Sequence, residues 1–290
     1  MVMEVLVGLN CRAGHLYVDG TVGEGGHARA ILDRIAQGGE LWGLDRDPEV
    51  LKAAAARLAP YTSRFRLFHR SYAELGETLA EAGRAQVAGI LLDLGLSLFS
   101  LQRSGRGFSF LGDEPLDMRF DPEGPGPTAA RLLNSASQAH LEKIFREYGE
   151  EPRARRLAHL VVQARQKTPL KTTQQFINLV QQAQGPGRYR RGRLHVATRA
   201  FQALRIAVNQ ELGQLAAFLT QAPAWLEPGG RLVIISYHSL EDRLVKRHFL
   251  AGERAGVLRR LTKKPQTPAP EELRRNPRAR SAKLRIAEKL

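Results

Sequence analysis

Glycines and a carboxylate are concentrated near the N-terminal end of the chain, in the stretch Leu16–His27, which reads LYVDGTVGEGGH. A short apolar run ends at Asp19, and four glycines follow within seven residues: Gly20, Gly23, Gly25 and Gly26. Glycine has no Cβ to block a tight turn or the close approach of a ligand. A glycine turn between a strand and a helix is typical of proteins that bind a nucleoside cofactor.

A carboxylate and an aromatic residue follow where such a fold would use them. Glu40–Leu44 reads as a strand that ends at Asp45, and an acid about 20 residues past the glycines binds ribose hydroxyls in folds of this class. A solvated carboxylate is the plain alternative for Asp45. Tyr72 follows the candidate strand Phe65–His69, and its ring would either stack on an adenine or fill a half-buried place in the core.

Apolar periodicity supplies the elements that would hold these side chains. A one-faced pattern over 28–35 predicts a helix after the glycine turn, and 47–58 reads as a second helix with Asp-Pro at its start. Two apolar runs are typical of buried parallel strands: 87–92, which is followed by Asp93, and 231–236. Alternating strands and helices predict an α/β fold with a parallel sheet that binds ligands at the carboxyl ends of its strands.

The long interval between the fourth and fifth strands indicates an insertion, because one crossover helix needs far fewer residues. Helical patterns begin at Ser137 and Thr172, with a third between them. We expect residues 103–200 to form a helical, basic subdomain for substrate recognition. It would be inserted into a discontinuous sheet domain made of 1–102 and 201–290.

The chain after the insertion is expected to return to the sheet. A continuous helix over 197–219 would lead to the fifth strand, and His238 would reach the active site from the end of that strand. Ser239 and Asp242 fit a capping box that opens the next helix. The proline-rich C-terminal segment is expected to be irregular until a final edge strand over 283–287.

The formal net charge of +15 is unevenly distributed. Residues 1–150 contain 16 Lys and Arg against 20 Asp and Glu, whereas 243–290 contain 15 against 4. The loop 185–193 is also basic and contains one tyrosine. This asymmetry favours a polyanionic partner, nucleic acid before membrane, and the loop suits phosphate and single-stranded base contacts. Solvated helix faces and a plain surface loop are the alternatives.

Composition excludes several classes of protein. Cys11 is the single cysteine, so neither disulfides within the chain nor a cysteine-rich zinc site is expected. No apolar run approaches the roughly 20 residues that span a bilayer, and the first residues do not read as a signal peptide. We therefore expect a cytoplasmic protein without a membrane partner.

Seven separated blocks of sequence, in order, resemble the bacterial ribosomal RNA small subunit methyltransferase H family over nearly the whole chain. The blocks are Asp19–Thr21 with Gly25–His27, Asp93–Gly95, Arg106–Phe110, Leu116–Arg119, Ala197–Ile206, His238–Arg243 and Asn276–Ser281. The resemblance implies a Rossmann-like class I S-adenosylmethionine-dependent methyltransferase sheet with an inserted helical subdomain. It further implies methyl transfer from S-adenosylmethionine to the exocyclic N4 of a cytidine in the decoding region of 16S rRNA, within the small ribosomal subunit.

The resemblance also implies roles for individual residues. The cofactor-binding positions of the family fall on Gly25, Gly26, His27, Asp45, Tyr72 and Asp93. Three departures stand out. Leu98 occupies a position where the family usually has a serine. Ser100 replaces a glutamine that touches the cofactor, and Gln102 is a candidate substitute for that glutamine. Tyr237 replaces a usual phenylalanine.

The implied reaction requires a positioned acceptor, because the lone pair of cytosine N4 is delocalised into the ring and the nitrogen gains charge as it is methylated. We assign this catalytic role to Asp93 or its neighbouring backbone, with Asp117 and His238 in reserve. The chemistry needs no metal, and the spacing of His and Asp offers no convincing ligand set.

Two other classes of protein share part of this pattern. An NAD-dependent oxidoreductase also uses a glycine turn and a strand-end acid, but it would not need the basic half. A non-catalytic RNA-binding or ribosome-assembly protein would explain the basic half and leave the cofactor residues without a purpose. Binding of NAD or S-adenosylmethionine, and methyl transfer itself, separate the three.

Overall fold

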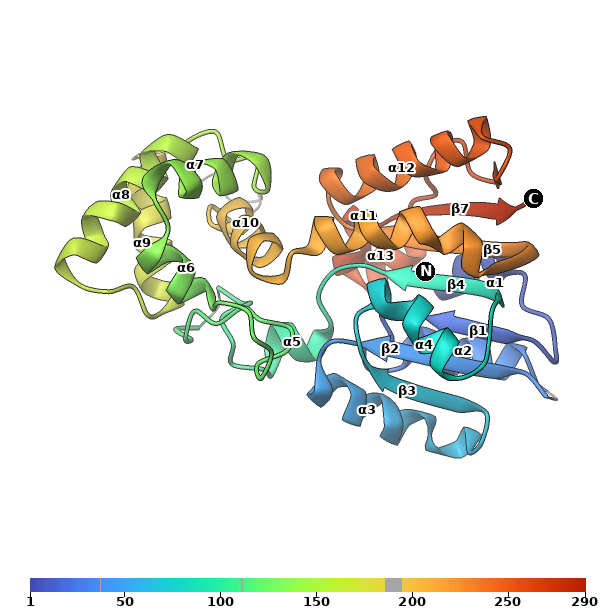
Figure 1. The fold of residues 1–290 in the computed structure, drawn as a ribbon. Coiled ribbons are helices and arrows are strands. Elements are labelled where there is room, and N and C mark those ends of the chain that lie inside the picture. The colour runs from blue at the N-terminus through green and yellow to red at the C-terminus, as the bar shows by residue number, and fades with distance from the viewer. Residues whose placement is uncertain (37, 111, 186–194) are drawn as a thin grey trace. The chain divides into compact units, whose positions relative to one another are not determined.

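The computed structural model describes the whole chain except residues 37, 111 and 186–194. The described residues divide into two compact units (Figure 1). Unit 1 consists of Met1–Ser97 and Leu212–Leu290, and unit 2 of Leu98–Glu211. The predicted basic loop, apart from Gly185, lies outside the described residues.

Unit 1 contains a seven-stranded sheet with the order β3-β2-β1-β4-β5-β7-β6. Its strands are β1 (Leu16–Asp19), β2 (Glu40–Asp45), β3 (Phe65–His69), β4 (Val87–Asp93), β5 (Leu226–Ser236), β6 (Leu258–Arg260) and β7 (Lys283–Lys289). The first five strands are parallel, and β7 runs antiparallel between β5 and β6. This order is that of the Rossmann-like class I methyltransferase sheet, so the predicted fold class is confirmed.

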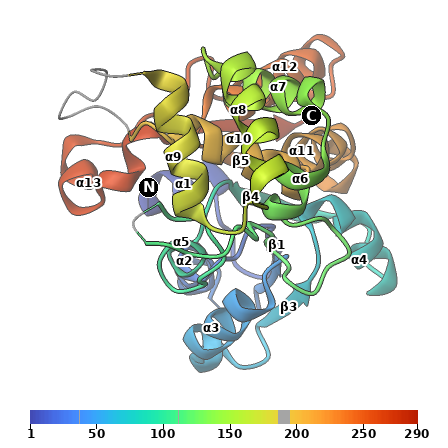
Figure 2. The ribbon, with the colours of Figure 1, turned by 90° about the vertical axis from the view of Figure 1, so that its left-hand side faces the viewer.

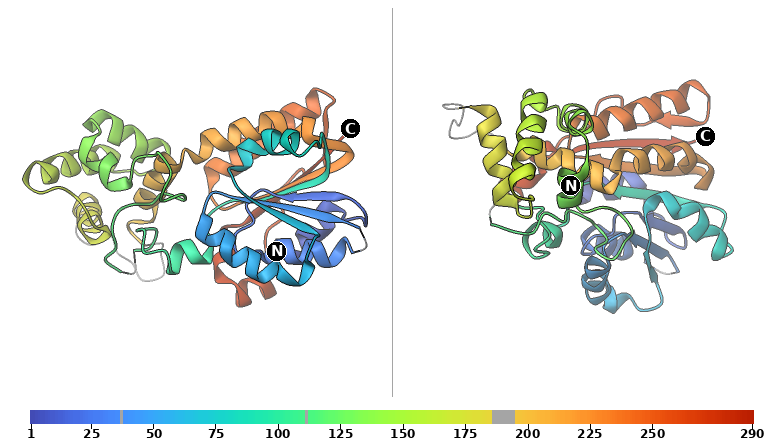
Figure 3. Two further views of the ribbon diagram at one scale, coloured as in Figure 1. Left: turned by 60° about the horizontal axis from the view of Figure 1, so that its bottom comes forward. Right: turned by 60° about the vertical axis from the view of Figure 1, so that its left-hand side comes forward.

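Helices cover both faces of the sheet, which the left panel of Figure 3 shows between them. On one face lie α1 (Val2–Leu9), α2 (Gly26–Arg34) and α3 (Pro48–Leu58), and on the other α4 (Leu75–Glu81), α11 (Glu211–Gln221) and α12 (Ser239–Arg254). Side chains of alternate strand residues enter the two cores: Tyr17 and Leu91 pack with α1 to α3, and Val18 and Ile90 with α4, α11 and α12. Burial on both faces explains why β1 and β4 are continuous apolar runs.

The remaining elements of unit 1 are short. They are α13 (Pro270–Arg275) and the 3₁₀ turns η1 (Ala59–Tyr61), η2 (Tyr72–Glu74), η3 (Ala222–Trp225) and η4 (Pro277–Ser281). The start of α3 is as predicted, because Pro48 is its first residue and the Asp47 side chain accepts a hydrogen bond from the Glu49 N–H at 3.1 Å. No helix within the described residues is long and apolar enough to cross a membrane.

Unit 2 is built from helices within its described part, and Figure 2 shows α7 to α10 together. They are α5 (Leu98–Gln102), α6 (Ala129–Ser135), α7 (Gln138–Glu147), α8 (Ala154–Lys167), α9 (Thr173–Gln184) and α10 (Thr198–Asn209). Phe145, Phe176 and Phe201 join α7, α9 and α10 in one aromatic cluster. Unit 2 extends beyond the expected 103–200 at both ends. It begins with α5, and at its other end Phe201 of α10 packs in this aromatic cluster.

The expected continuous helix over 197–219 is wrong. The helix ends at Asn209, Gln210 adopts a left-handed conformation with φ of 52°, and α11 starts afresh at Glu211. The Asn209 side chain is buried and donates to the Met118 carbonyl at 2.7 Å, while its Oδ1 accepts from the Phe120 N–H at 2.8 Å. The amide therefore ties the helix end to a loop of unit 2, and the chain turns there without a glycine or proline.

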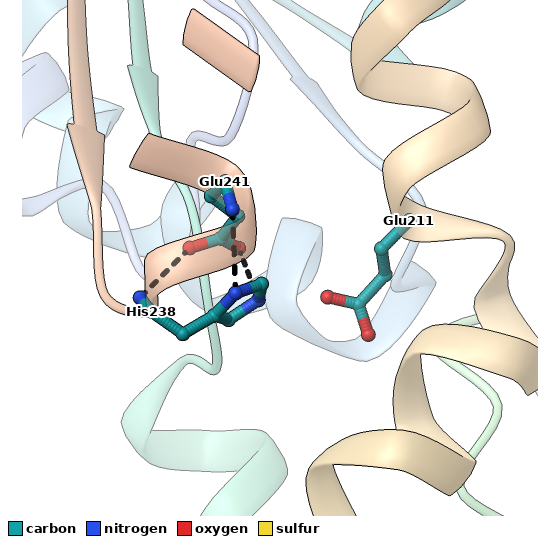
Figure 4. A group of neighbouring side chains, drawn as sticks. All are labelled: Glu211, His238 and Glu241. Atoms are coloured by element: carbon teal, nitrogen blue, oxygen red, sulfur yellow. Dashed lines mark hydrogen bonds and ion pairs between the residues drawn. The ribbon is translucent and has the colours of Figure 1, made fainter. Parts of the chain in front are cut away.

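Two expectations about the C-terminal part are also corrected. β7 is not an edge strand, because the short strand β6 pairs with its outer side and forms the edge. The capping box of α12 starts one residue earlier than Ser239. The N-cap is His238, whose Nδ1 accepts the Glu241 N–H at 3.4 Å while Glu241 Oε2 accepts the His238 N–H at 3.3 Å (Figure 4).

Candidate active site

The glycine turn lies between the carboxyl ends of β4 and β2. The Gly20 N–H donates to the Leu91 carbonyl at 2.9 Å, and the Val22 N–H donates to the Leu44 carbonyl at 3.0 Å. A Cβ on Gly20 would lie 2.5 Å from Leu92 Cδ2 and 2.9 Å from Tyr72 Cβ, so a larger residue there would displace both side chains. Gly25 has φ of 80° and caps α2, whose first residue is Gly26. The first N–H groups of a helix have no intrahelical partners, so this turn presents donors to a ligand.

Asp45 closes the turn from β2. Its Oδ2 accepts the Gly23 N–H at 3.0 Å and its Oδ1 accepts the Asp47 N–H at 3.0 Å. Burial raises the pKa of Asp45 to about 6, against the lowering effect of these backbone hydrogen bonds. The carboxylate therefore orders both the glycine turn and the start of α3, and its remaining lone pairs can accept hydrogen bonds from a diol.

Asp93 lies on the other side of the turn, at the end of β4. Its N–H donates to Thr21 Oγ1 at 2.6 Å, which ties it to the turn. Its Oδ2 lies 3.4 Å from Nε2 of His27 on α2, and its Oδ1 accepts a hydrogen bond from the Tyr237 hydroxyl at 2.9 Å. The structure thus brings Asp93 and His27 together, as expected for two residues of one site.

A third carboxylate lies beneath this pair. Asp19 is 1% exposed, and burial raises its pKa to about 7, although the charge of His27 and the hydrogen bond from the Thr21 N–H act to lower it. Asp19, Asp45 and Asp93 place three carboxyl groups around the glycine turn of a chain whose net charge is +15. A ligand with cationic groups, such as the sulfonium and ammonium of S-adenosylmethionine, fits this set of acceptor oxygens.

Tyr72 lies beside the turn as the first residue of η2. A Cβ on Gly20 would be 2.9 Å from Tyr72 Cβ, and the Tyr72 ring meets Phe218 of α11 edge-on at 5.5 Å between ring centroids. One edge of the ring is therefore fixed in the core while the residue remains half-buried. Tyr72 therefore packs in the core through one edge of its ring, while its partial exposure is compatible with stacking on an adenine.

The reserve candidates have partners of their own. Asp117 of unit 2 accepts two hydrogen bonds from the Arg119 guanidinium, both at 2.8 Å. His238 caps α12, and its Nε2 lies 3.1 Å from Glu241 Oε1. Neither role needs a substrate, and the choice of Asp93 as the acceptor stays a prediction. Leu98, Ser100 and Gln102 lie on α5 of unit 2, with Ser100 buried and Gln102 exposed.

Thr21 and Tyr237 are site residues that sequence reasoning missed. Thr21 lies within the glycine stretch, and its hydroxyl accepts the Asp93 N–H at the end of β4. A hydroxyl residue among turn glycines is only a weak sequence signal for such a contact. Tyr237 directly follows the fifth strand, as Asp93 ends the fourth. Since β4 and β5 are adjacent and parallel, their carboxyl ends must meet, and that rule could have paired the two residues.

A sheet of this order, with a glycine turn after β1 and carboxyl groups at the ends of β2 and β4, has the arrangement of the class I methyltransferase fold. A sequence model of the MraW methylase family matches residues 1–290. The chain belongs to the MraW methylase family.

Relatives named "Ribosomal RNA small subunit methyltransferase H" are similar to the chain over nearly its full length. The protein of Nitratidesulfovibrio vulgaris strain DP4 is 48% identical over 303 residues, which cover 99% of this chain and 93% of the relative. That of Geobacter sulfurreducens is 48% identical over 305 residues, with 100% and 97% covered. That of Solidesulfovibrio magneticus is 48% identical over 307 residues, with 100% and 94% covered.

Family membership confirms the resemblance found in the sequence, and with it the expected cofactor, S-adenosylmethionine. It also removes the NAD-dependent oxidoreductase from consideration. The individual cofactor-binding and catalytic assignments stay predictions, which the geometry around Asp45 and Asp93 now makes specific.

Proposed function

We propose that this protein methylates the exocyclic N4 of a cytidine in the decoding region of 16S rRNA, and that its substrate is this RNA within the small ribosomal subunit. The observation that carries the proposal is the place of Asp93. Its carboxylate stands at the end of a central strand, is tied to the glycine turn through Thr21, and is 26% exposed. It is therefore both fixed in position and accessible to a base. An rRNA substrate also implies a cytoplasmic enzyme.

Bound S-adenosylmethionine supplies an electrophilic methyl group on a sulfonium. The chain must hold the cytosine nitrogen about 3 Å from that carbon and stabilise the positive charge that develops on it. The Asp93 carboxylate would accept an N4–H hydrogen bond, which orients the nitrogen and stabilises that charge. As the nitrogen–methyl bond forms and the sulfur–methyl bond breaks, Asp93 would take the N4 proton and the sulfonium would leave as a neutral thioether. Gly25, Gly26 and Asp45 would hold the cofactor, with Tyr72 beside its adenine and His27 beside Asp93.

The C-terminal arm, defined here as α13 and η4 (residues 270–281), provides a surface for the RNA backbone in unit 1. Arg275, Arg278 and Arg280 are exposed on it, and within the described part of the chain none of them forms an ion pair with a carboxylate. Glu272 of the arm is close enough to influence the pKa of Tyr237, so the arm adjoins the site. Exposed guanidinium groups beside an active site suit phosphate contacts.

The test is transfer of radiolabelled methyl from S-adenosylmethionine to purified small subunits and to naked 16S rRNA, followed by nucleoside analysis. We expect label in N4-methylcytidine. Cofactor binding with label in no nucleoside would support the non-catalytic RNA-binding alternative, and label in another nucleoside would overturn the choice of N4.

Asp93→Asn tests the acceptor within the same assay. We expect a loss of turnover of at least about 100-fold, the usual range for removal of one charge-stabilising group. Asp33→Asn is the matched control, since Asp33 is an exposed acid on α2 that also accepts a tyrosine hydroxyl, that of Tyr61. Unchanged turnover in Asp93→Asn, with cofactor binding intact, would show that another group is the acceptor.

A further inference from the structure

Tyr237 is fixed on three sides directly after β5. Its N–H donates to Glu241 Oε2 at 2.9 Å, and its ring packs on Gly95, where a Cβ would lie 3.2 Å from Cδ2 of the ring. Its hydroxyl donates to Asp93 Oδ1 at 2.9 Å. Gly95 has φ of 118° and no side chain, so the loop after β4 leaves room for the ring. The phenol is therefore held against the carboxylate by the fold.

We propose that Tyr237 is a positioning residue for methyl transfer, whose hydroxyl fixes the orientation of the Asp93 carboxylate through Oδ1 while Oδ2 faces His27. This inference rests on the proposed role of Asp93 as the acceptor. A hydrogen bond to one oxygen restrains rotation of the carboxylate about its side-chain bond, so the acceptor lone pairs keep a preferred direction. Preorganised acceptors of this kind need no reorientation when charge develops on the substrate.

The direction of the hydrogen bond follows from the charges around it. Burial raises the pKa of Tyr237, and the negative charges of Asp93, Glu241 and Glu272 raise it further. The hydroxyl is therefore the donor of this hydrogen bond at neutral pH, and Asp93 Oδ1 accepts it. Among the described residues, the other titratable groups near the pair are His27 on α2, Asp19 on β1 and, beside His27, the N-terminal amino group. They are the same in wild type and in a Tyr237 variant.

Tyr237→Phe removes one oxygen and keeps the ring that packs on Gly95. We expect turnover to fall roughly tenfold, the loss that one hydrogen bond to a charged group typically produces. A carboxylate without that donor is protonated more readily, so the acid limb of the pH–turnover profile should move to higher pH. The pH profile of the S-adenosylmethionine dissociation constant should move in the same direction, because the cofactor site adjoins Asp93. A residue with a purely structural role would move neither profile.

The experiment is a double-mutant cycle of Tyr237→Phe and Asp93→Asn, read in turnover and in calorimetric binding of S-adenosylmethionine from pH 5.5 to 8.5. Tyr61→Phe is the control, since it removes the tyrosine hydroxyl that is bonded to Asp33 on the same helix as His27. We expect Tyr237→Phe to act only when Asp93 is present, so that the double variant behaves like Asp93→Asn alone.

The outcomes separate this inference from the function on which it rests. An unaffected Asp93→Asn variant would remove the acceptor role itself. The role of Tyr237 would be overturned if Asp93→Asn is defective but Tyr237→Phe has the same effect with Asp93 present as with Asn at that position. It would also be overturned if the effect of Tyr237→Phe is no larger than that of Tyr61→Phe. Thermal unfolding of each variant shows whether a loss of activity reflects a loss of folded protein, and the binding cycle remains readable when Asp93→Asn has no turnover.

Discussion

Nε2 of His27 lies 3.4 Å from Oδ2 of Asp93, and this pair joins the start of α2 to the end of β4. Its other ring nitrogen, Nδ1, is buried and has no hydrogen-bond partner among the described residues. Burial alone would lower the pKa of His27, but the hydrogen bond and charge of Asp93, with the charge of Asp19, outweigh it and the pKa is raised. The pair is therefore favoured when the imidazole is protonated.

A pH dependence of folding follows from this pair. Because the folded-state pKa of His27 is above its unfolded value of about 6.5, its stabilisation is complete below that value and is lost as pH rises through the folded pKa. We expect the difference in unfolding free energy between wild type and His27→Gln to shrink from pH 6 to pH 9, measured by urea denaturation. A difference that stays constant or grows over this range would contradict the assigned protonation state.

Asp19 should destabilise the folded protein at neutral pH. Its pKa is raised by burial to about 7 from an unfolded value of 3.8, so its favourable contribution is complete below pH 3.8 and is lost as pH rises through 7. Asp19→Asn keeps an oxygen that can accept the Thr21 N–H. We expect it to be more stable than wild type at pH 8 by roughly 2–4 kcal/mol and to bind S-adenosylmethionine more weakly. Denaturation at pH 5 and pH 8 measures the first effect, with Asp33→Asn as the control.

Asp45→Asn should impair both the turn and the cofactor. The two carboxylate oxygens each accept a backbone N–H, and an amide offers one oxygen and places an NH₂ against the other donor. We expect a loss of about 1–3 kcal/mol in unfolding free energy, the cost of an unsatisfied buried donor. S-adenosylmethionine binding should weaken by roughly tenfold or more, measured by calorimetry. Loss of stability with unchanged affinity would mean that Asp45 serves the turn alone.

The glycine turn, the strand ends and most helices could be predicted because their signals are local. Asp47 and Pro48 fix the start of α3 through one N-cap and one allowed proline position, and neither depends on distant residues. The carboxyl ends of parallel strands converge whatever the rest of the chain does, so Asp45 and Asp93 were expected at one edge.

Features that depend on tertiary partners were not predicted. The break at Gln210 has no glycine or proline to mark it and follows from the hydrogen bonds of Asn209 to a loop about 90 residues earlier in the sequence. Likewise, β6 is three residues long, too short for a periodic pattern, so β7 looked like the edge of the sheet. Tyr237 is bonded to Asp93 across 144 positions, and only the strand order brings the two together.

Asn209 gives a test of the separate stability of unit 2. Asn209→Ala leaves the Met118 carbonyl and the Phe120 N–H without this amide, in a loop where Met118 already has φ of 59°. We expect unit 2 to lose about 1–3 kcal/mol of stability, seen as faster hydrogen exchange in α10. The affinity of unit 1 for S-adenosylmethionine should stay within about twofold of wild type, since additivity holds for sites without shared partners. An equal loss in both would show that the two units unfold together.

RNA binding should depend steeply on salt, and the C-terminal arm should account for part of that slope. Replacing Arg278 and Arg280 with Gln removes two exposed charges that have no carboxylate partner in the described structure. If each contacts a phosphate, the slope of log affinity against log salt concentration should fall by about 1.5. The control replaces Arg66 and Arg84, which removes the same net charge from residues paired with Glu40. Filter binding of 16S rRNA fragments at several salt concentrations gives both slopes. Equal changes in the two double variants would mean that net charge, and not this arm, determines RNA affinity.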